Sequence, residues 1–196
     1  PLDNNEIIIN RLSGNYRYPC NFMFVASMNP CPCGFYGDEE KECKCTEQEI
    51  HRYIRKISGP LLDRIDIQIQ VQRPKYKKIK EKTNVENSEI IRKRVNLARQ
   101  IQLKRYEKYK IYSNAEMTTK MIAEYCKLDI KSEELLQKAF EKFKLSLRAY
   151  EKILKVARTI ADIDSKENIE IKHIAEAIQY RCLDKFSPEE ENEIWK

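Results

Sequence analysis

The chain has 196 residues, of which 35% are charged and 41% apolar, and its formal net charge is +6. This composition excludes a disordered chain, which has fewer apolar residues, and a membrane protein, which has fewer charges. No apolar run approaches the roughly 18 residues that a membrane span needs. The mild positive charge permits an anionic partner such as nucleic acid, although solvated lysine-rich helices would give the same value.

Seven cysteines are present, and four of them lie between Cys31 and Cys45. A small secreted domain would instead have an evenly spread cysteine framework, so we expect a reducing, cytoplasmic environment. The chain begins at Pro1 without a methionine or a signal peptide, and we interpret it as a piece of a longer protein.

Glycine and proline divide the chain into two parts. All four glycines and six of the seven prolines lie in the first 74 residues. Because these residues mark turns, we predict strands and loops for residues 1–74 and an almost wholly helical domain for residues 75–196. The predicted boundary lies in the lysine-rich stretch that follows Pro74.

The first part contains three strand patterns. Residues 6–11 and 15–18 are short β-branched or aromatic runs around a turn, which predicts a hairpin. The continuous apolar run 22–27 predicts a strand buried on both faces in a parallel sheet. Strict alternation over residues 65–71 predicts a further strand with one drier face.

Helices are predicted from capping residues and apolar periodicity. The predicted helices cover residues 46–57, 88–109, 118–127, 132–143 and 146–162, then a segment with Ile171, Ile174, Ala175 and Ile178 on one face, and a last turn from Ser187. Thr46 and Glu49 form a capping box for the first, and Ser or Thr caps are expected at Thr118, Ser132 and Ser146. The apolar stripe of helix 146–162, which includes Leu147, is assigned to the core.

Two loops beside predicted strands carry candidate functional groups. Asn29 follows the run 22–27, and open α/β sheets bind ligands at the carboxyl ends of such strands. Its amide would orient a water or a phosphate oxygen, or Asn-Pro simply forms the turn. Arg64 offers phosphate a planar, permanently charged fork. The alternative is an ion pair with Asp63 or Asp66.

Arg148 and the two histidines give weaker signals. Arg148 lies in the first turn of its predicted helix, where the helix dipole disfavours a cation, which indicates an anionic partner from elsewhere in the fold. His51 is assigned to a solvated helix face. His173 is expected to face solvent or to cap a neighbouring helix.

The clustered cysteines form two short pairs, Cys31-Pro-Cys33 and Cys43-Lys-Cys45, separated by nine residues. Four thiolates from two such pairs can close a tetrahedral zinc site, and free thiols or a redox pair are the alternatives. Four protein ligands would leave no open coordination position, so the metal would be structural.

Several catalytic patterns are absent from the sequence. It has no Gly-x-x-x-x-Gly-Lys-Ser/Thr loop and no apolar strand that ends in Asp-Glu. With two histidines it offers no convincing Ser/His/Asp or Cys/His set. We therefore expect the chain on its own not to be an enzyme.

Three segments together resemble one family. They are residues 26–34 (Ala-Ser-Met-Asn-Pro-Cys-Pro-Cys-Gly), residues 58–66 (Ser-Gly-Pro-Leu-Leu-Asp-Arg-Ile-Asp) and residues 145–162, which include Leu-Ser-Leu-Arg-Ala-Tyr and Arg-Thr-Ile-Ala-Asp. The chain resembles the magnesium-chelatase-like AAA+ ATPases of the ComM/YifB type, which are bacterial and linked to competence and branch migration. The resemblance covers nearly the whole chain. It implies the second half of an α/β P-loop core in residues 1–74 and an all-helical lid in residues 75–196, without the Walker A and Walker B regions.

The resemblance also implies roles for single residues. Asn29 matches sensor 1, which positions the attacking water, and Arg64 matches the arginine finger that reaches the ATP of the adjacent subunit. Arg148 matches the sensor 2 arginine of the lid, near the phosphates. The pre-sensor-1 hairpin would contact DNA through Arg11, Ser13 and Asn15. Its tip departs from the lysine common in replicative helicases, and the four-cysteine loop is typical of many members of the family.

The function implied is a motor that uses ATP and magnesium, with structural zinc, and couples hydrolysis to DNA strand movement. We expect a homo-oligomeric ring, a hexamer, and only weak ATP binding by this chain alone. One alternative is a non-catalytic, zinc-stabilised module that binds nucleic acid or protein. Another is a metal-chelatase subunit, although the chain lacks the Asp-x-Ser-x-Ser motif of integrator-type chelatase subunits.

Overall fold

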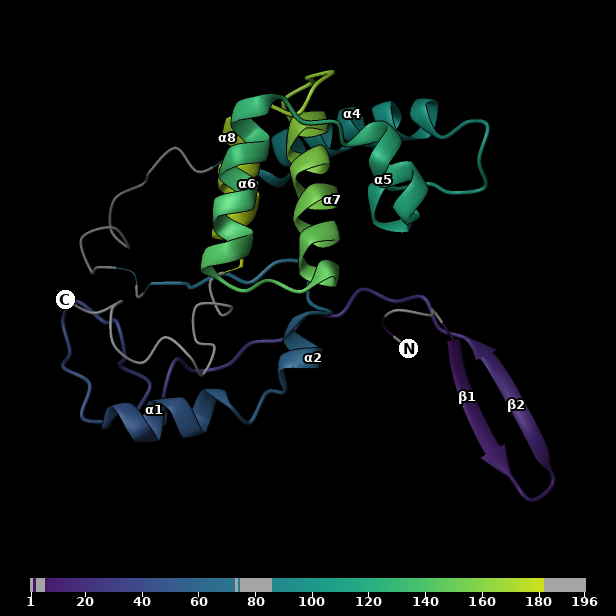
Figure 1. The fold of residues 1–196 in the computed structure, drawn as a ribbon. Coiled ribbons are helices and arrows are strands. Elements are labelled where there is room, and N and C mark those ends of the chain that lie inside the picture. Colours follow the sequence, from purple (N-terminus) through teal and green to yellow (C-terminus); the bar gives the residue numbers. More distant parts are fainter. Residues whose placement is uncertain (1, 3–5, 73, 75–85, 182–196) are drawn as a thin grey trace. The chain divides into compact units, whose positions relative to one another are not determined.

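The computed structural model describes residues 2, 6–72, 74 and 86–181. The chain divides into two compact units, Pro1–Arg64 and Ile65–Lys196, and each is described by itself (Figure 1). The predicted domain boundary after Pro74 lies outside the described residues, as do Cys182 and the last turn predicted from Ser187. Among the described helices, none combines the length and the apolar character that a membrane span requires.

The first unit begins with the predicted hairpin. Strands β1 (Glu6–Arg11) and β2 (Gly14–Pro19) pair antiparallel, with Ile7 opposite Tyr18 and Ile9 opposite Tyr16. Opposite residues project from the same face of a ladder, so these four side chains form an apolar face that remains partly exposed.

Two short helices follow in the first unit. Helix α1 (Glu47–Ile54) starts at Thr46, and the predicted capping box with Glu49 is confirmed. The helix ends three residues before the predicted position. Helix α2 (Gly59–Leu62) is a single turn with proline at its start.

The two predicted parallel strands do not form in the described part of the chain. Residues 22–27 are exposed and lie in no ladder, and residues 65–71 contribute only one bridge, between Gln68 and Arg181. A strand needs a neighbour whose backbone groups are unpaired. The described residues contain only the hairpin as a sheet, and its two strands pair with each other.

The second unit is helical, which confirms the mixed fold class and agrees with an all-helical lid. Its elements are α4 (Ser88–Arg105), the 3₁₀ turn η1 (Asn114–Glu116), α5 (Thr119–Tyr125), α6 (Ile130–Lys142), α7 (Leu147–Ile163) and α8 (Ile171–Gln179). Helix α7 packs against α4, α5 and α8, and α6 packs against α8 (Figure 1). Thr118 and Ser146 cap α5 and α7 as predicted. Asp129, and not Ser132, caps α6, because its carboxylate accepts a hydrogen bond from the Ser132 amide at 2.8 Å.

The core of the second unit contains most residues of the two predicted apolar stripes, but not the first residue of either stripe. Its centre is formed by Leu136, Ile153, Ala157, Ala161 and Ile174. Two residues assigned to the stripes are exposed: Leu147 by 70% and Ile171 by 45%. Both lie in the first turn of a helix, where the chain enters from solvent.

Candidate functional site

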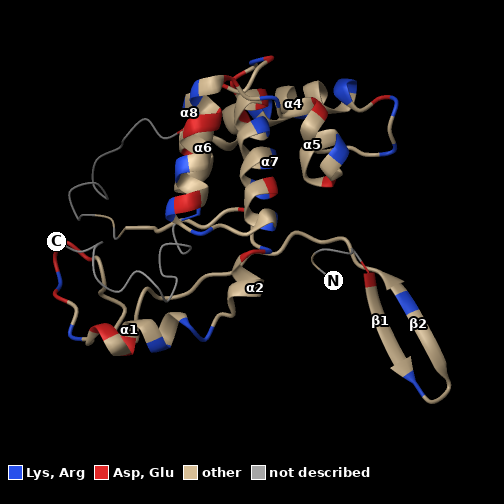
Figure 2. Ribbon diagram, in the orientation of Figure 1, with Lys and Arg blue, Asp and Glu red and all other residues tan. Residues whose placement is uncertain are grey.

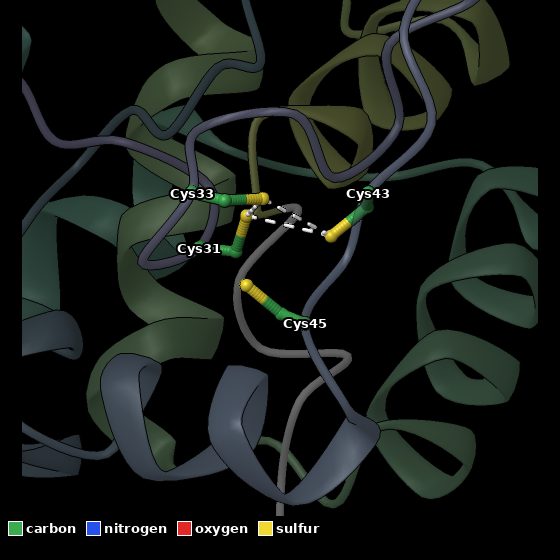
Figure 3. A group of neighbouring side chains, drawn as sticks. All are labelled: Cys31, Cys33, Cys43 and Cys45. Atoms are coloured by element: carbon green, nitrogen blue, oxygen red, sulfur yellow. Dashed lines mark hydrogen bonds between the residues drawn. The ribbon is translucent and has the colours of Figure 1, made fainter.

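The four clustered cysteines converge on one point from two segments of the first unit (Figure 3). Their sulfur atoms all lie within 4.8 Å of one another, and the Cys31 Sγ is 3.3 Å from Cys33 Sγ and 3.6 Å from Cys43 Sγ. In a tetrahedral zinc site with Zn–S bonds of about 2.3 Å, the sulfurs are about 3.8 Å apart. The arrangement therefore fits a metal ion of this size, and the predicted convergence of the two cysteine pairs is confirmed.

Backbone amides stabilise negative charge on the cysteine sulfurs. The Gly34 amide donates to Cys31 Sγ at 3.2 Å. Backbone hydrogen bonds from Phe35 and Lys44 lower the pKa of Cys33 to about 6. A backbone hydrogen bond from Cys33 also lowers the pKa of Cys45, but desolvation and the neighbouring thiols outweigh it and raise that pKa to about 12. A cation bound among the four sulfurs would favour the thiolate form of each of them, because metal ligands must be deprotonated.

Gly34 is required by the loop geometry, and Asn29 lies beside it. The φ angle of Gly34 is +83°, which side chains other than glycine rarely adopt. A Cβ atom at Gly34 would lie 4.0 Å from the amide of Asn29. The structure therefore places the predicted sensor 1 residue against the cysteine loop, with its side chain exposed.

Arg64 directly follows α2 and its cap residue, Asp63. Its Nη1 donates to the Pro60 carbonyl at 2.7 Å, which orients the guanidinium along the preceding turn. The side chain remains partly exposed. Asp66, one of its two predicted alternative partners, accepts a hydrogen bond from Lys152.

Arg148 lies in the first turn of α7, as predicted, and is exposed. Ser146 caps this turn by accepting a hydrogen bond from the Ala149 amide at 3.1 Å. Asn29 and Arg64 belong to the first unit and Arg148 to the second, and each is described within its own unit.

The tip of the hairpin is fully accessible. Leu12 is exposed over its whole side chain, and Arg11, Ser13 and Asn15 beside it are also exposed. The Ser13 hydroxyl lies 3.4 Å from the Tyr16 hydroxyl. The predicted DNA-contacting residues are therefore brought together at the turn.

A buried charge cluster in the second unit was not predicted from the sequence. Asp162, which has no exposed surface, accepts hydrogen bonds from both Nη atoms of Arg105, from Asn114 Nδ2 at 2.8 Å and from Arg158 Nε at 3.2 Å. Arg158 also donates to the carbonyls of Glu167 and Lys166. The sequence does contain a sign of this ion pair, because Arg158 and Asp162 are four residues apart on a helix whose neighbouring positions are apolar.

His173 is also placed differently from its prediction. It is buried, with 1% of its surface exposed. Its Nδ1 accepts a hydrogen bond from the Glu170 amide at 2.9 Å, and its Nε2 lies 3.2 Å from Asp164 Oδ2. The imidazole thus caps its own helix, α8, and not a neighbouring one.

Comparison with known families matches both parts of the chain. Residues 1–79 match the family described as magnesium chelatase, subunit ChlI, and residues 85–181 match the family described as magnesium chelatase, subunit ChlI C-terminal. The two matches follow each other along the chain with a short gap.

Curated relatives extend over nearly the whole chain. Competence protein ComM of Haemophilus influenzae is 40% identical over 184 residues, which are 93% of this chain and 35% of that protein. YifB of Escherichia coli is 37% identical over 188 residues, 95% of this chain and 36% of that protein. YifB of Salmonella typhimurium is 33% identical over 187 residues, with the same coverage of each chain. The chain spans about a third of the length of these relatives.

Proposed function

This chain belongs to the magnesium-chelatase-like family of ComM and YifB, and from that premise we propose that it is the C-terminal part of a AAA+ ATPase that couples ATP hydrolysis to DNA remodelling or branch migration. The proposal rests on one observation: the match to the chelatase subunit family and the match to its C-terminal family follow each other along this one chain. The name of the relative from Haemophilus influenzae links that protein to competence.

Three residues would act on the nucleotide in the intact protein. ATP supplies the phosphoryl group and magnesium offsets its charge. The Asn29 amide would orient the attacking water while remaining uncharged. Arg64 would project into the site of the adjacent subunit and stabilise transition-state charge, and Arg148 would contact the phosphates from the lid. Asn29 and Arg148 are exposed and Arg64 is partly exposed, which supports access to such a ligand.

The cysteine cluster would hold structural zinc in the reducing cytoplasm. The sulfur distances and the amide hydrogen bonds to the cysteines support this assignment. Four sulfur ligands would complete the coordination shell, so zinc would stabilise the loop of residues 31–45 and take no part in hydrolysis.

DNA and further subunits complete the proposal. The exposed hairpin tip with Arg11, Ser13 and Asn15 would contact DNA in the centre of a homo-oligomeric ring, which we take to be a hexamer. Arg64 needs such a ring, because an arginine finger acts only at a subunit interface.

A subunit-mixing experiment tests the proposal most directly. Full-length protein that carries Arg64→Ala is titrated into the wild type, and ATPase activity is measured. Losing an arginine finger costs about a thousandfold or more at the site it serves. We expect pure Arg64→Ala protein to bind ATP without hydrolysing it, and mixed rings to lose activity as mutant subunits enter them, because each mutant subunit disables its neighbour.

The control is Arg52→Ala, which removes an exposed arginine from α1 in the same unit. Its mixtures should retain full activity. If pure Arg64→Ala protein is fully active, Arg64 has only a structural role. Full-length wild type without ATPase activity would favour the non-catalytic binding module.

A further inference from the structure

Helix α4 carries an unusually dense positive charge. Its 18 residues include six lysines and arginines and one acid, Glu89, so the helix has a charge of +5 where the whole chain has +6. Figure 2 shows the mixed distribution of acidic and basic residues on the other helices of this unit. Helix α4 thus carries a larger positive charge than any other helix that the structure describes.

Half of these cations are neutralised within the second unit. Lys93 pairs with Glu89 at 2.9 Å. Arg94 forms a two-pronged pair with Glu86, at 2.9 and 3.1 Å. Arg105 pairs with Asp162. In the part of the chain that the structure describes, Arg92, Arg99 and Lys104 have no acidic partner, and all three are exposed.

Arg92 and Arg99 lie on one side of the helix. Seven residues are about two turns, so the two side chains emerge about 10.5 Å apart along the axis and within about 20° of each other. Asn96 lies between them, and we call these three residues the arginine stripe. Lys104 emerges about 140° around the helix from Arg99 and is outside the stripe.

The stripe lies on a part of α4 that is accessible. Every residue from Ser88 to Leu97 is exposed, and Ala98 is the first buried residue of the helix. The helix is anchored at its other end, through Gln102 and Arg105, to the buried cluster around Asp162. A rigid, anchored helix therefore presents two unneutralised guanidinium groups to solvent.

We propose that the arginine stripe of α4 binds the phosphate backbone of DNA, as a contact surface separate from the hairpin tip. This inference rests on the proposed DNA-remodelling function and names a further site for its substrate. Guanidinium groups form paired hydrogen bonds with phosphate oxygens. Duplex DNA has one charge per roughly 1.7 Å of axis, so two forks about 10.5 Å apart each reach a phosphate in any sequence.

An acidic protein surface fits the stripe less well. Protein interfaces have an apolar, desolvated core, with charged residues depleted there. The position between the two arginines holds Asn96, whose amide donates to a phosphate oxygen as readily as it contacts a protein. Two exposed apolar residues, Val95 and Leu103, lie on the same side of the helix, but they are about two turns apart and form no continuous apolar core. The stripe thus offers charge and a polar donor, which is the pattern of a backbone contact.

The test measures the salt dependence of DNA binding by the 196-residue chain. A fluorescein-labelled duplex of about 30 base pairs and mixed sequence is titrated at several salt concentrations and followed by fluorescence anisotropy. Each lost phosphate contact lowers the slope of log K against log salt by about 0.9. We expect Arg92→Ala/Arg99→Ala to lower the slope by about 2 and the affinity at low salt at least tenfold.

Two controls separate a specific contact from general electrostatics. Lys104→Ala removes a charge from the same helix outside the stripe and should leave the slope within experimental error. Arg92→Lys/Arg99→Lys keeps the charges and should retain most of the slope. Circular dichroism should show the same helix content in every variant.

Several results would overturn the proposal. One is an unchanged slope of log K against log salt in the double alanine variant. Another is a Lys104→Ala variant that loses as much slope per removed charge as the double alanine variant. The third is no binding of the duplex by the wild-type chain. An unchanged slope combined with altered self-association in sedimentation would assign the stripe to an acidic protein surface instead. The Arg64 mixing experiment does not depend on α4, so the proposed motor function can fail or succeed independently.

Discussion

The two units of the chain are stabilised by different means. In the second unit, one cluster of buried apolar side chains joins α5, α6, α7 and α8. In the described residues of the first unit, the buried apolar side chains are only Cys31, Ile50 and Ile54. The first unit therefore depends on the four-cysteine loop, whereas the second has the burial that a domain needs to fold by itself.

The largest expected effect on the first unit, with no effect on the second, comes from removing one of the four cysteines that would bind the metal. Structural zinc contributes on the order of 10 kcal/mol to the folding of small sites. We expect Cys33→Ser to abolish zinc binding and to expose the amides of residues 31–54 to rapid hydrogen exchange. Exchange in α6, α7 and α8 should not change. Zinc content by elemental analysis and exchange by mass spectrometry measure both effects.

Cys20→Ser is the matched control for that prediction. Cys20 belongs to the same unit but lies outside the cysteine cluster. It should retain one zinc ion per chain. Freshly reduced wild-type protein without zinc, or normal protection in Cys33→Ser, would show that the loop is stable without a metal.

In the second unit, the stability should depend most strongly on the buried carboxylate of Asp162. Asp162→Asn leaves the buried Arg158 and the largely buried Arg105 without their anion. Breaking a buried ion pair by removing one partner costs about 3–5 kcal/mol. Urea unfolding followed by circular dichroism measures this loss.

Asp66→Asn is its control, since the Asp66 side chain, which pairs with Lys152, is itself 59% exposed. Exposed pairs contribute about 0–1 kcal/mol. Equal effects of the two substitutions would mean that the buried cluster contributes nothing special to stability.

The smallest expected effect is a pH dependence at the end of α7. Hydrogen bonds from Lys172 and His173 lower the pKa of Asp164 below its ordinary value. A lowered carboxylate pKa in the folded state stabilises the protein above the unfolded value, near pH 4, and this contribution is lost as the pH falls through the folded pKa.

Asp164→Asn tests this dependence. The free energy of unfolding of the wild type should exceed that of the variant above about pH 4, by less than about 1 kcal/mol because the carboxylate is partly exposed. The difference should shrink as the pH falls below 4. A difference that grows on acidification would assign another group to the effect.

Local features of the fold were predictable from the sequence. Thr46, Thr118 and Ser146 cap their helices because a capping hydrogen bond depends on residues within one turn. The hairpin and the convergence of the two cysteine pairs depend on longer but still local spans, residues 6–19 and 31–45. The metal itself and the nucleotide roles of Asn29, Arg64 and Arg148 stay predictions.

Long-range features were not predictable in the same way. The run 22–27 has the composition of a central strand, but a ladder depends on partners that composition does not specify. His173 was expected to face solvent or to cap a neighbouring helix, and no role was predicted for Asp162, yet both are buried. Their hydrogen bonds join partners between 3 and 57 residues away along the chain, and a search for apolar periodicity does not consider such pairs.

The last cysteine of the cluster, Cys45, is followed directly by Thr46, the capping residue of α1. A helix of eight residues does not persist in water by itself, because the first turn costs more conformational entropy than its few hydrogen bonds return. A metal held by the four sulfurs would fix the backbone immediately before that first turn and would supply the nucleus from which α1 grows. Loop and helix should consequently form and melt as one cooperative unit.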